Sequence, residues 1–119
     1  MVTSSRNLAA TDIRTVVVTN AEQLAHAYAV RSICFMEETG LTAYQAFDGN
    51  DFQATHIVVY AGDEPIGAAR LRWFGDFAKI ERTAFRKAYR SARTLRICAD
   101  FVFAHVARKG VLEADHARQ

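Results

Sequence analysis

Three β-rich segments that follow one another with only tight turns between them constrain the fold of this chain most. They are residues 55–61, 66–73 and 77–85, separated by Gly62-Asp-Glu-Pro65 and Gly75-Asp76. Turns this short join antiparallel strands, because a parallel connection needs a crossover of about a dozen residues or more. The middle of the chain is therefore predicted to form an antiparallel sheet.

The segment before this run predicts a strand, a helix and a loop. Residues 15–19 read Thr-Val-Val-Val-Thr, and β-branched residues favour a strand. Asn20 can accept a hydrogen bond at the start of a helix, with Gln23 at the capping-box position. We expect that helix to run to about Glu37 and residues 39–52 to form a loop.

A second helix is predicted after the three strands, beginning close to Arg90. Its apolar positions recur at the spacing of one helix face. That face carries Leu95, Cys98, Phe101, Val102 and His105. Gly110 is predicted to end the helix, because glycine often follows a helix C-terminus and Arg108 and Lys109 carry the charge that suits it. Residues 111–114 are then predicted to begin a strand parallel to its neighbour.

The predicted element order is β-α-β-β-β-α-β, which indicates an α/β (α+β) fold. We expect a mixed, mostly antiparallel sheet flanked by helices. At 119 residues the chain is long enough for one domain. That domain is predicted over residues 13–119, after a flexible N-terminus of residues 1–12.

Charge and cysteine content narrow the functional class. The formal net charge of +2 is too small to indicate nucleic acid by itself, so a nucleic-acid binder is the weakest option. Cys34 and Cys98 lie in apolar helical patterns and predict buried, reduced thiols in a cytoplasmic protein. No signal peptide, membrane span or zinc site is predicted, because no apolar run is long enough and the histidines lack metal-ligand spacing.

Positive charge is concentrated between the last strand of the run and the second helix. The first backbone N–H groups of a helix have no internal partner, and the helix dipole adds positive charge there. The cationic side chains at this place are Arg86, Lys87, Arg90, Arg93 and Arg96. Strand, basic loop and helix start together predict a site for a phosphorylated ligand.

The hairpin, the third strand of the run and the basic loop together carry a family resemblance. The hairpin reads Thr55-His-Ile-Val-Val-Tyr, Gly-Asp-Glu-Pro and Ile66-Gly-Ala-Ala-Arg-Leu-Arg, the strand Ala78-Lys-Ile-Glu-Arg-Thr-Ala-Phe, and the loop begins at Tyr89-Arg90. These segments resemble the GNAT superfamily of N-acyltransferases. The resemblance implies transfer of an acyl group, acetyl first of all, from acetyl-CoA or another acyl-CoA to a small-molecule or peptide amine, without a metal.

Glu81 is the candidate general base under this resemblance. An amine must lose a proton before it attacks a thioester, and a carboxylate on the central strand can accept that proton directly or through water. The residues alone also allow a structural role for Glu81, in an ion pair with Arg82, Arg70 or Lys79.

The resemblance also implies where the acyl donor would lie. Backbone groups of Thr83, Ala84 and Phe85 would bind the pantetheine arm much as a sheet binds an added strand. The pyrophosphate would lie against Arg90, Ser91, Ala92, Arg93, Thr94 and Leu95. Arg93 and Leu95 stand where the family usually has small residues, so a catalytically inactive acyl-CoA-binding module is an alternative.

The resemblance covers most of the chain but not the last elements of the family's fold. The domain is therefore expected to be C-terminally incomplete. A strand after Gly110 would then leave an unpaired sheet edge, and we expect a second copy of the chain to cover it in a homodimer.

A narrower resemblance concerns acyl-homoserine-lactone and N-acyl amino acid synthases, which share the GNAT fold. It is carried by Arg31, Phe35, Asp48, Asp51, Arg70, Glu81 and Arg82. These enzymes usually take the acyl group from acyl carrier protein, and an arginine-rich loop suits that acidic partner. A carrier-protein-dependent synthase is therefore the second candidate.

Two groups of charged residues have simpler interpretations. Asp48 and Asp51 could bind an amine acceptor, but short acidic residues beside glycine and asparagine more often form turns. Arg31 is expected to pair with Glu37 and Glu38 on a helix surface rather than to belong to a site.

Overall fold

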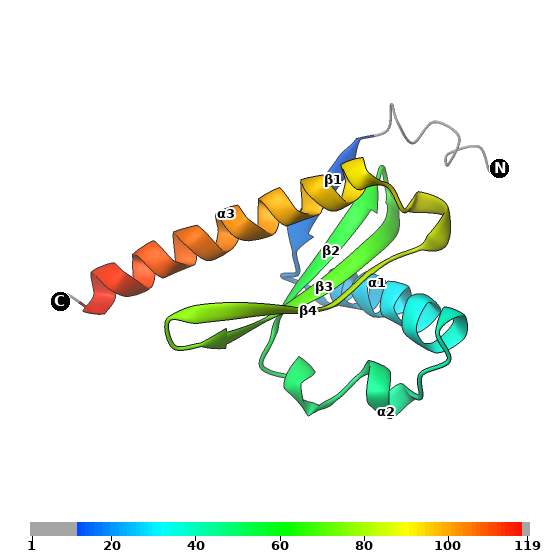
Figure 1. Ribbon diagram of the computed structural model, residues 1–119, viewed down its shortest axis with the longest axis horizontal. Coiled ribbons are helices and arrows are strands. Elements are labelled where there is room, and N and C mark those ends of the chain that lie inside the picture. Colours follow the sequence, from blue (N-terminus) through cyan, green and yellow to red (C-terminus); the bar gives the residue numbers. More distant parts are fainter. Residues whose placement is uncertain (1–11, 118–119) are drawn as a thin grey trace.

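The fold is built on one antiparallel sheet of four strands. The computed structural model describes the backbone of residues 12–117 and the side chains of residues 12–110. The strands are β1 (Ile13–Val17), β2 (Thr55–Ala61), β3 (Glu64–Phe74) and β4 (Phe77–Phe85). They lie in the order β1-β2-β3-β4, and each pair of neighbours is antiparallel (Figure 1).

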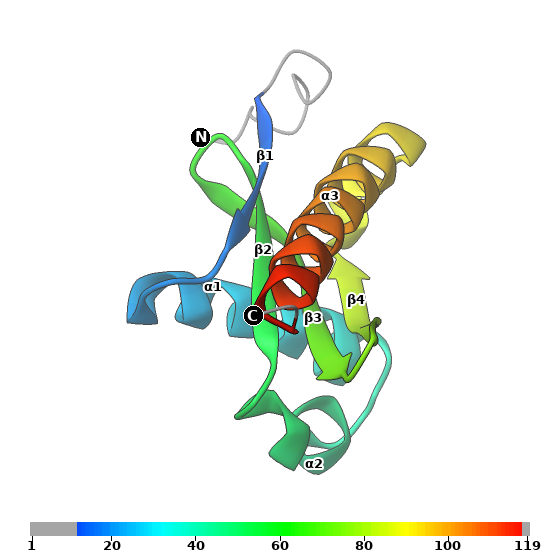
Figure 2. The same ribbon diagram turned by 90° about the vertical axis from the view of Figure 1, so that its left-hand side faces the viewer.

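Two longer helices cover the two faces of the sheet. In Figure 2, α1 and α3 lie on opposite sides of the central strands. A π-helix continues α1, and short helices precede β2 and α3. The helical segments are α1 (Ala21–Arg31), the π-helix Ser32–Glu38, α2 (Ala43–Ala46), the 3₁₀ turns Gly49–Asp51 and Lys87–Tyr89, and α3 (Ala92–Ala117).

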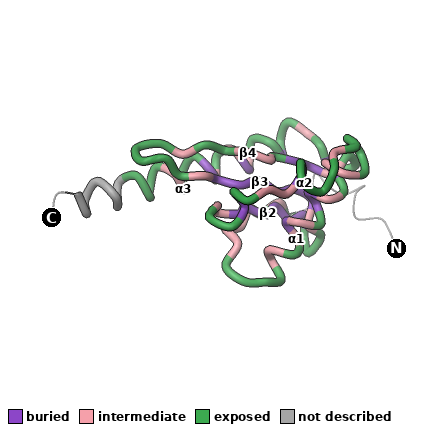
Figure 3. The backbone as a smooth tube through the Cα atoms, turned by 90° about the horizontal axis from the view of Figure 1, so that it is seen from below, coloured by how far each residue is buried: buried purple, intermediate pink, exposed green. Residues whose placement is uncertain are grey.

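The core has two layers because the central strands are buried on both faces. Ile57 and Val59 of β2 pack with Cys98 and Val102 of α3. Their neighbours on the opposite face of β2 and β3, Val58, Tyr60 and Ala68, pack with Ala27 and Val30 of α1. Burial is accordingly concentrated in β2 and β3, whereas the tip of the β3–β4 hairpin is exposed (Figure 3). The apolar run of β2 follows from this double burial.

The predicted α/β class and the flanked antiparallel sheet are confirmed. The bounds predicted for β2 and β4 match the structure, whereas β1 begins at Ile13 rather than Thr15. Asn20 caps α1 by accepting a hydrogen bond from the Gln23 N–H at 2.8 Å. The predicted loop 39–52 contains two short helices, each closed by a capping box. Local side-chain to backbone bonds thus order a segment that composition marks as a loop.

The strand predicted for residues 111–114 is wrong, because α3 continues to Ala117. Gly110 is not among the glycines with positive φ, so it does not adopt the left-handed conformation that ends helices. A glycine inside a helix is unfavourable by only about 1 kcal/mol relative to alanine, which a long helix tolerates. The described sheet therefore has no parallel strand, and its edges are β1 and β4.

The apolar face of α3 and the N-terminus were also predicted from the sequence. Leu95, which was placed on the apolar face of the second helix, is 49% exposed, whereas Cys98 and Val102 of the same face are buried. The predicted flexible N-terminus lies outside the described residues apart from Asp12. Within the described part of the chain, no helix has the length and apolar character that crossing a membrane requires.

Candidate active site

Strand β4 carries a β-bulge in its middle. The register of β3 against β4 shifts between Ala68 and Arg70, so that Ala69 lies opposite two residues, Arg82 and Thr83. Arg82 has a φ of 54°, a left-handed conformation that few non-glycine residues adopt. A bulge takes its extra residue out of the ladder and bends the strand. The ladder between β3 and β4 is therefore interrupted at Arg82 and Thr83.

A pocket of about 290 Å³ opens beside the bulge. It lies on the face of the sheet that α1 covers, because Ala84 and Cys34 belong to that core layer. We call it the β4 pocket, and its lining residues are Cys34, Phe35, Thr39, Thr83, Ala84, Phe85, Arg90 and Leu95. The structure thus brings together five of the predicted donor-site residues, those at 83–85, 90 and 95.

The opposite wall of the β4 pocket was not predicted from the sequence. It comes from the π-helix Ser32–Glu38 and the residue after it, which supply Cys34, Phe35 and Thr39. The Thr39 hydroxyl donates a hydrogen bond to the Cys34 carbonyl at 2.8 Å. π-Helical turns are rare and often lie at functional sites. The apolar pattern predicts an ordinary helix up to Glu37 and carries no signal for the wider turn.

Arg90 lies at the boundary of the β4 pocket, between the two walls. Its Nε donates to the Phe85 carbonyl at 2.7 Å, and its Nη2 forms an ion pair with Glu38 of the π-helix. Burial raises the pKa of the Cys34 thiol, and Glu38 raises it further while Arg90 lowers it. A thiol with a raised pKa is protonated at neutral pH, which argues against Cys34 as a nucleophile.

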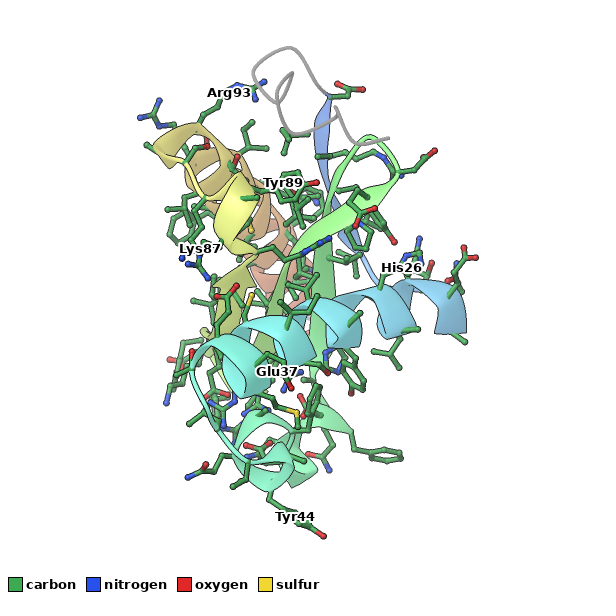
Figure 4. All side chains as sticks on the ribbon, turned by 90° about the vertical axis from the view of Figure 1, so that its right-hand side faces the viewer. His26, Glu37, Tyr44, Lys87, Tyr89 and Arg93 are labelled. Atoms are coloured by element: carbon green, nitrogen blue, oxygen red, sulfur yellow. The ribbon has the colours of Figure 1, made fainter. Side chains whose placement is uncertain are left out.

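The predicted anion site at the start of α3 is partly closed by the chain itself. Ser91 caps the helix, because its Oγ accepts the Thr94 N–H at 3.0 Å. Thr94 is fully buried. The other residues around this helix start, Lys87, Ala92, Arg93 and Arg96, are exposed, and Figure 4 shows Lys87 and Arg93 on the outer side. A phosphate site here stays a prediction.

Glu81 is held in ion pairs on the strand side of the site. Its carboxylate accepts from Arg70 Nη2 at 3.0 Å and Arg72 Nη1 at 3.3 Å, and Lys79 Nζ lies 3.4 Å away. Burial would raise the pKa of Glu81, but hydrogen bonds from these three cations hold it below its usual value. The pairs with Arg70 and Lys79 match the alternative role predicted for Glu81, whereas Arg82 pairs elsewhere.

Arg31 is a buried residue, and its predicted surface pairing with Glu37 and Glu38 is wrong. Its side chain is 1% exposed, and its Nη1 lies 2.7 Å from Asp51 Oδ1. Its Nη2 donates to the Ala46 carbonyl at 2.6 Å. Sequence spacing suggested partners on the same helix, but a loop folded back over α1 supplies a closer carboxylate.

The aspartates of that loop join α1 to strands β3 and β4. Asp51 and Asp48 accept from Arg70 Nη1 at 3.0 and 2.8 Å. Asp48 also accepts from Arg82 Nη2 at 3.1 Å. Arginine hydrogen bonds hold the pKa of Asp48 and, against the effect of its burial, the pKa of Asp51 below the usual range. We call this set the arginine–carboxylate cluster: Arg31, Asp48, Asp51, Arg70, Glu81 and Arg82.

The cluster was partly visible in the sequence. The turn-forming role predicted for Asp48 and Asp51 is present, because each belongs to the capping box of the 3₁₀ turn. Their pairing with Arg31 and Arg70 depends on contacts across about twenty residues, which spacing does not reveal. Among the described residues, no group of histidine, cysteine, aspartate and glutamate side chains is arranged to hold a metal ion.

Comparison with known proteins finds relatives that are named as N-acetyltransferases. The uncharacterized N-acetyltransferase YjcF of Bacillus subtilis (strain 168) is 38% identical over 80 residues, which are 67% of this chain and 57% of that protein. A crystal structure of a Lactobacillus plantarum protein, provisionally named an N-acetyltransferase, matches with a TM-score of 0.76 and 30% identity over 82% of this chain and 69% of that one. Escherichia coli ElaA matches in fold, with a TM-score of 0.62 and 20% identity over 79% of this chain and 68% of that one. No family model matches the chain.

The fold and these relatives define the class of the protein. The chain belongs to the GNAT superfamily of N-acetyltransferases, as the hairpin and the fourth strand predict. It spans 57% of the length of YjcF, so the likeness covers little more than half of that protein.

Proposed function

We propose that this chain carries the acyl-donor site of an N-acetyltransferase that moves an acetyl group directly from acetyl-CoA to an amine. The observation that carries the proposal is the β4 pocket. One side of this pocket is the bulge of β4, whose backbone groups would bind the donor. The other side is the start of α3, which exposed cations surround. An extended, anionic thioester needs these features in this order.

The residues of the β4 pocket fit such a donor chemically. Its walls offer apolar side chains, including Phe35, Ala84 and Leu95, to an acetyl group and its thioester sulfur. Lys87, Arg93 and Arg96 offer positive charge to the pyrophosphate. Acetyl-CoA would supply an activated acyl group, whose carbonyl carbon accepts the amine.

The chain's own groups would act on that transfer in two ways. Backbone N–H groups beside the bulge would donate hydrogen bonds to the thioester oxygen, where negative charge grows during attack. The amine nitrogen bonds to the carbonyl carbon, the carbon–sulfur bond breaks, and CoA leaves as a thiolate. Glu81 would accept the proton that the amine loses, directly or through water, and that proton finally neutralises the thiolate.

Glu81 is a modest base in this arrangement, because its ion pairs lower its pKa. We therefore expect Glu81→Gln to reduce kcat by about 10- to 100-fold, which is at or below the lower end of the roughly 100- to 10,000-fold contribution of a general base. The pH profile should lose its acidic limb, while binding of acetyl-CoA stays within about twofold. An unchanged kcat would limit Glu81 to its structural ion pairs.

Isothermal titration with acetyl-CoA, desulfo-CoA and ADP tests the donor site. We expect binding of all three, with the affinity loss from CoA to ADP reporting the pantetheine arm. Arg90→Ala and Arg93→Ala should weaken binding. Arg108→Ala is the matched control, because Arg108 is exposed on the same helix about 22 Å beyond Arg93. No binding of any ligand would overturn the proposal.

A carrier-protein-dependent synthase is the second candidate, and two observations favour it. Ser91 already caps α3, and Arg93 is a large, exposed cation where a phosphate-binding loop usually has a small residue. Acyl carrier protein is acidic, and an exposed basic loop would attract it. Salt-dependent binding of acyl carrier protein, together with no heat from acetyl-CoA, would favour this candidate over the first.

We also propose that the chain forms a homodimer, through the open edge of β4 rather than through a strand after Gly110. Within the described sheet β4 pairs only with β3, so its other edge is open. Phe77 and Ile80 on this strand are 58% and 46% exposed. Open, apolar strand edges favour pairing with another chain. Sedimentation that gave a monomer at high concentration would contradict the dimer.

A further inference from the structure

The bulge of β4 depends on a residue that does not suit its conformation. When a bulge of this kind has its first residue in the left-handed region, that residue is usually glycine. Here it is Arg82, with a φ of 54°. The left-handed region is unfavourable for residues that carry a Cβ, and such outliers persist only where their surroundings hold them. The surroundings of Arg82 should therefore contain the restraint.

The restraint comes from α2 and the segment that follows it. Arg82 Nη2 donates to Asp48 Oδ2 at 3.1 Å and to the Gln45 carbonyl at 3.2 Å. Asp48 is itself fixed, because its Oδ1 accepts from Arg70 at 2.8 Å and from the Asn50 N–H at 3.0 Å. The Arg70 side chain is 1% exposed. Arg82 is thus tied to a carboxylate that has a buried anchor.

We propose that Arg82 is a positioning residue, whose ion pair with Asp48 holds the bulge in the shape that turns β4 backbone groups toward the β4 pocket. Thr83, the residue after Arg82, lines that pocket and shares the bulge. The ion pair connects the 42–51 loop to the backbone at the pocket. This inference rests on the proposed acetyl transfer for its kinetic readout, but not for its structural one.

The competing explanation is that the Arg82 guanidinium contacts the substrate directly. A glycine at position 82 distinguishes this role from the positioning role. Glycine adopts a φ near +54° without strain, so Arg82→Gly removes the side chain yet favours the bulge. Arg82→Ala removes the same charge and keeps the Cβ that disfavours it. Both variants lose the guanidinium equally, so only the backbone preference differs between them.

The kinetic test compares four variants with the unmodified chain. We expect Arg82→Ala to lower kcat about 5- to 30-fold, the population change that corresponds to the strain of one left-handed residue. Arg82→Gly should stay within about threefold, and KM for acetyl-CoA should change little in either. Asp48→Asn should lower kcat in the unmodified chain but hardly at all in the Arg82→Gly background.

Glu64→Gln is the matched control. It makes the same carboxylate-to-amide change in an exposed pair with Arg86, and the Glu64 side chain is 50% exposed. We expect no change in kcat. Equal losses in Arg82→Gly and Arg82→Ala would overturn the inference in favour of a guanidinium that acts on the substrate. An undiminished Asp48→Asn effect in the glycine background would overturn it as well.

A structural readout keeps the inference testable if the chain does not transfer acetyl groups. A residue with positive φ has a short distance between its amide and α protons, which gives a strong intraresidue nuclear Overhauser effect. That signal at position 82 should be strong in the unmodified chain and weaker in Asp48→Asn. A signal that stays strong in Asp48→Asn would refute the restraint, whatever the activity. Absent acetyl transfer with the expected signals would reject only the proposed function.

Discussion

Asp51 is the residue whose loss should destabilise the folded chain most clearly through charge. It lies 2.7 Å from Arg31 and 3.0 Å from Arg70, whose side chains are each 1% exposed. Asp51→Asn keeps the shape of the side chain but leaves these two arginines with less compensating charge. Breaking a buried ion pair by removing one partner typically lowers the free energy of unfolding by about 3–5 kcal/mol. For a domain of this size, that corresponds to a fall in Tm of about 10–20 °C.

Urea unfolding followed by circular dichroism measures the effect, with Glu64→Gln as the exposed control. The control should lose less than about 1 kcal/mol. Arg31→Met combined with Asp51→Asn should be less destabilising than the sum of the single changes, because the buried charge and its partner then leave together. A loss below about 1 kcal/mol for Asp51→Asn would refute the argument, since the cluster would then behave like a surface ion pair.

The difference in the free energy of unfolding between the unmodified chain and Asp51→Asn should depend on pH, and the sign of this dependence can be worked out. Asp51 has a lower pKa in the folded chain than in the unfolded chain. The unfolded chain therefore takes up the proton first as the pH falls below about 4, the ordinary aspartate pKa. The stabilisation by Asp51 is complete above that pH and is lost as the pH falls through the folded-state pKa. The difference in the free energy of unfolding between the unmodified chain and Asp51→Asn should therefore become smaller over the same pH range.

Three further predictions concern packing, thiols and a histidine. A Cβ at Gly67 would lie 2.5 Å from the Phe85 ring, so Gly67→Ala should lower the free energy of unfolding by about 1–3 kcal/mol, as measured by urea unfolding. Gly49→Ala is the control and should change it little, because the space around Gly49 is open. Burial raises the pKa of Cys98 to about 11, so a thiol reagent at pH 8 should label it only after unfolding, and acetyl-CoA should slow labelling of Cys34 alone. Burial, Arg108 and Lys109 lower the pKa of His105, so stability should fall below about pH 6.5, where the unfolded chain binds the proton first, and His105→Leu should remove that slope in urea unfolding.

The sheet could be predicted because its signals are local. Gly62 and Gly75 have positive φ in the structure, so each marks a turn that few other residues would form. Between these turns, apolar and β-branched residues identify the strands. Gly110 follows two cations as a helix-ending glycine would, yet it lies within α3. Two cations followed by a glycine can also lie inside a long helix, so this pattern does not by itself mark a helix end.

The candidate site was predicted only where it is made of continuous chain. Residues 83–85 and Arg90 reach the β4 pocket because they belong to one strand and the loop after it. The opposite wall depends on a π-helical turn, and the bulge depends on an arginine in a glycine-like conformation. Neither has a local sequence signature. Both are imposed by contacts between segments that are distant in sequence.

The arginine–carboxylate cluster links the stability of this chain to the shape of its site. Asp51 and Asp48 share the buried Arg70, and Asp48 alone extends to Arg82 at the bulge. Loss of Asp51 should therefore reduce stability first and activity only as the loop loosens. Loss of Asp48 should reduce activity at a smaller stability loss, because its side chain is 29% exposed. A glycine at position 82 should restore activity to the Asp48 variant but not stability to the Asp51 variant, which separates the two functions of one charged cluster.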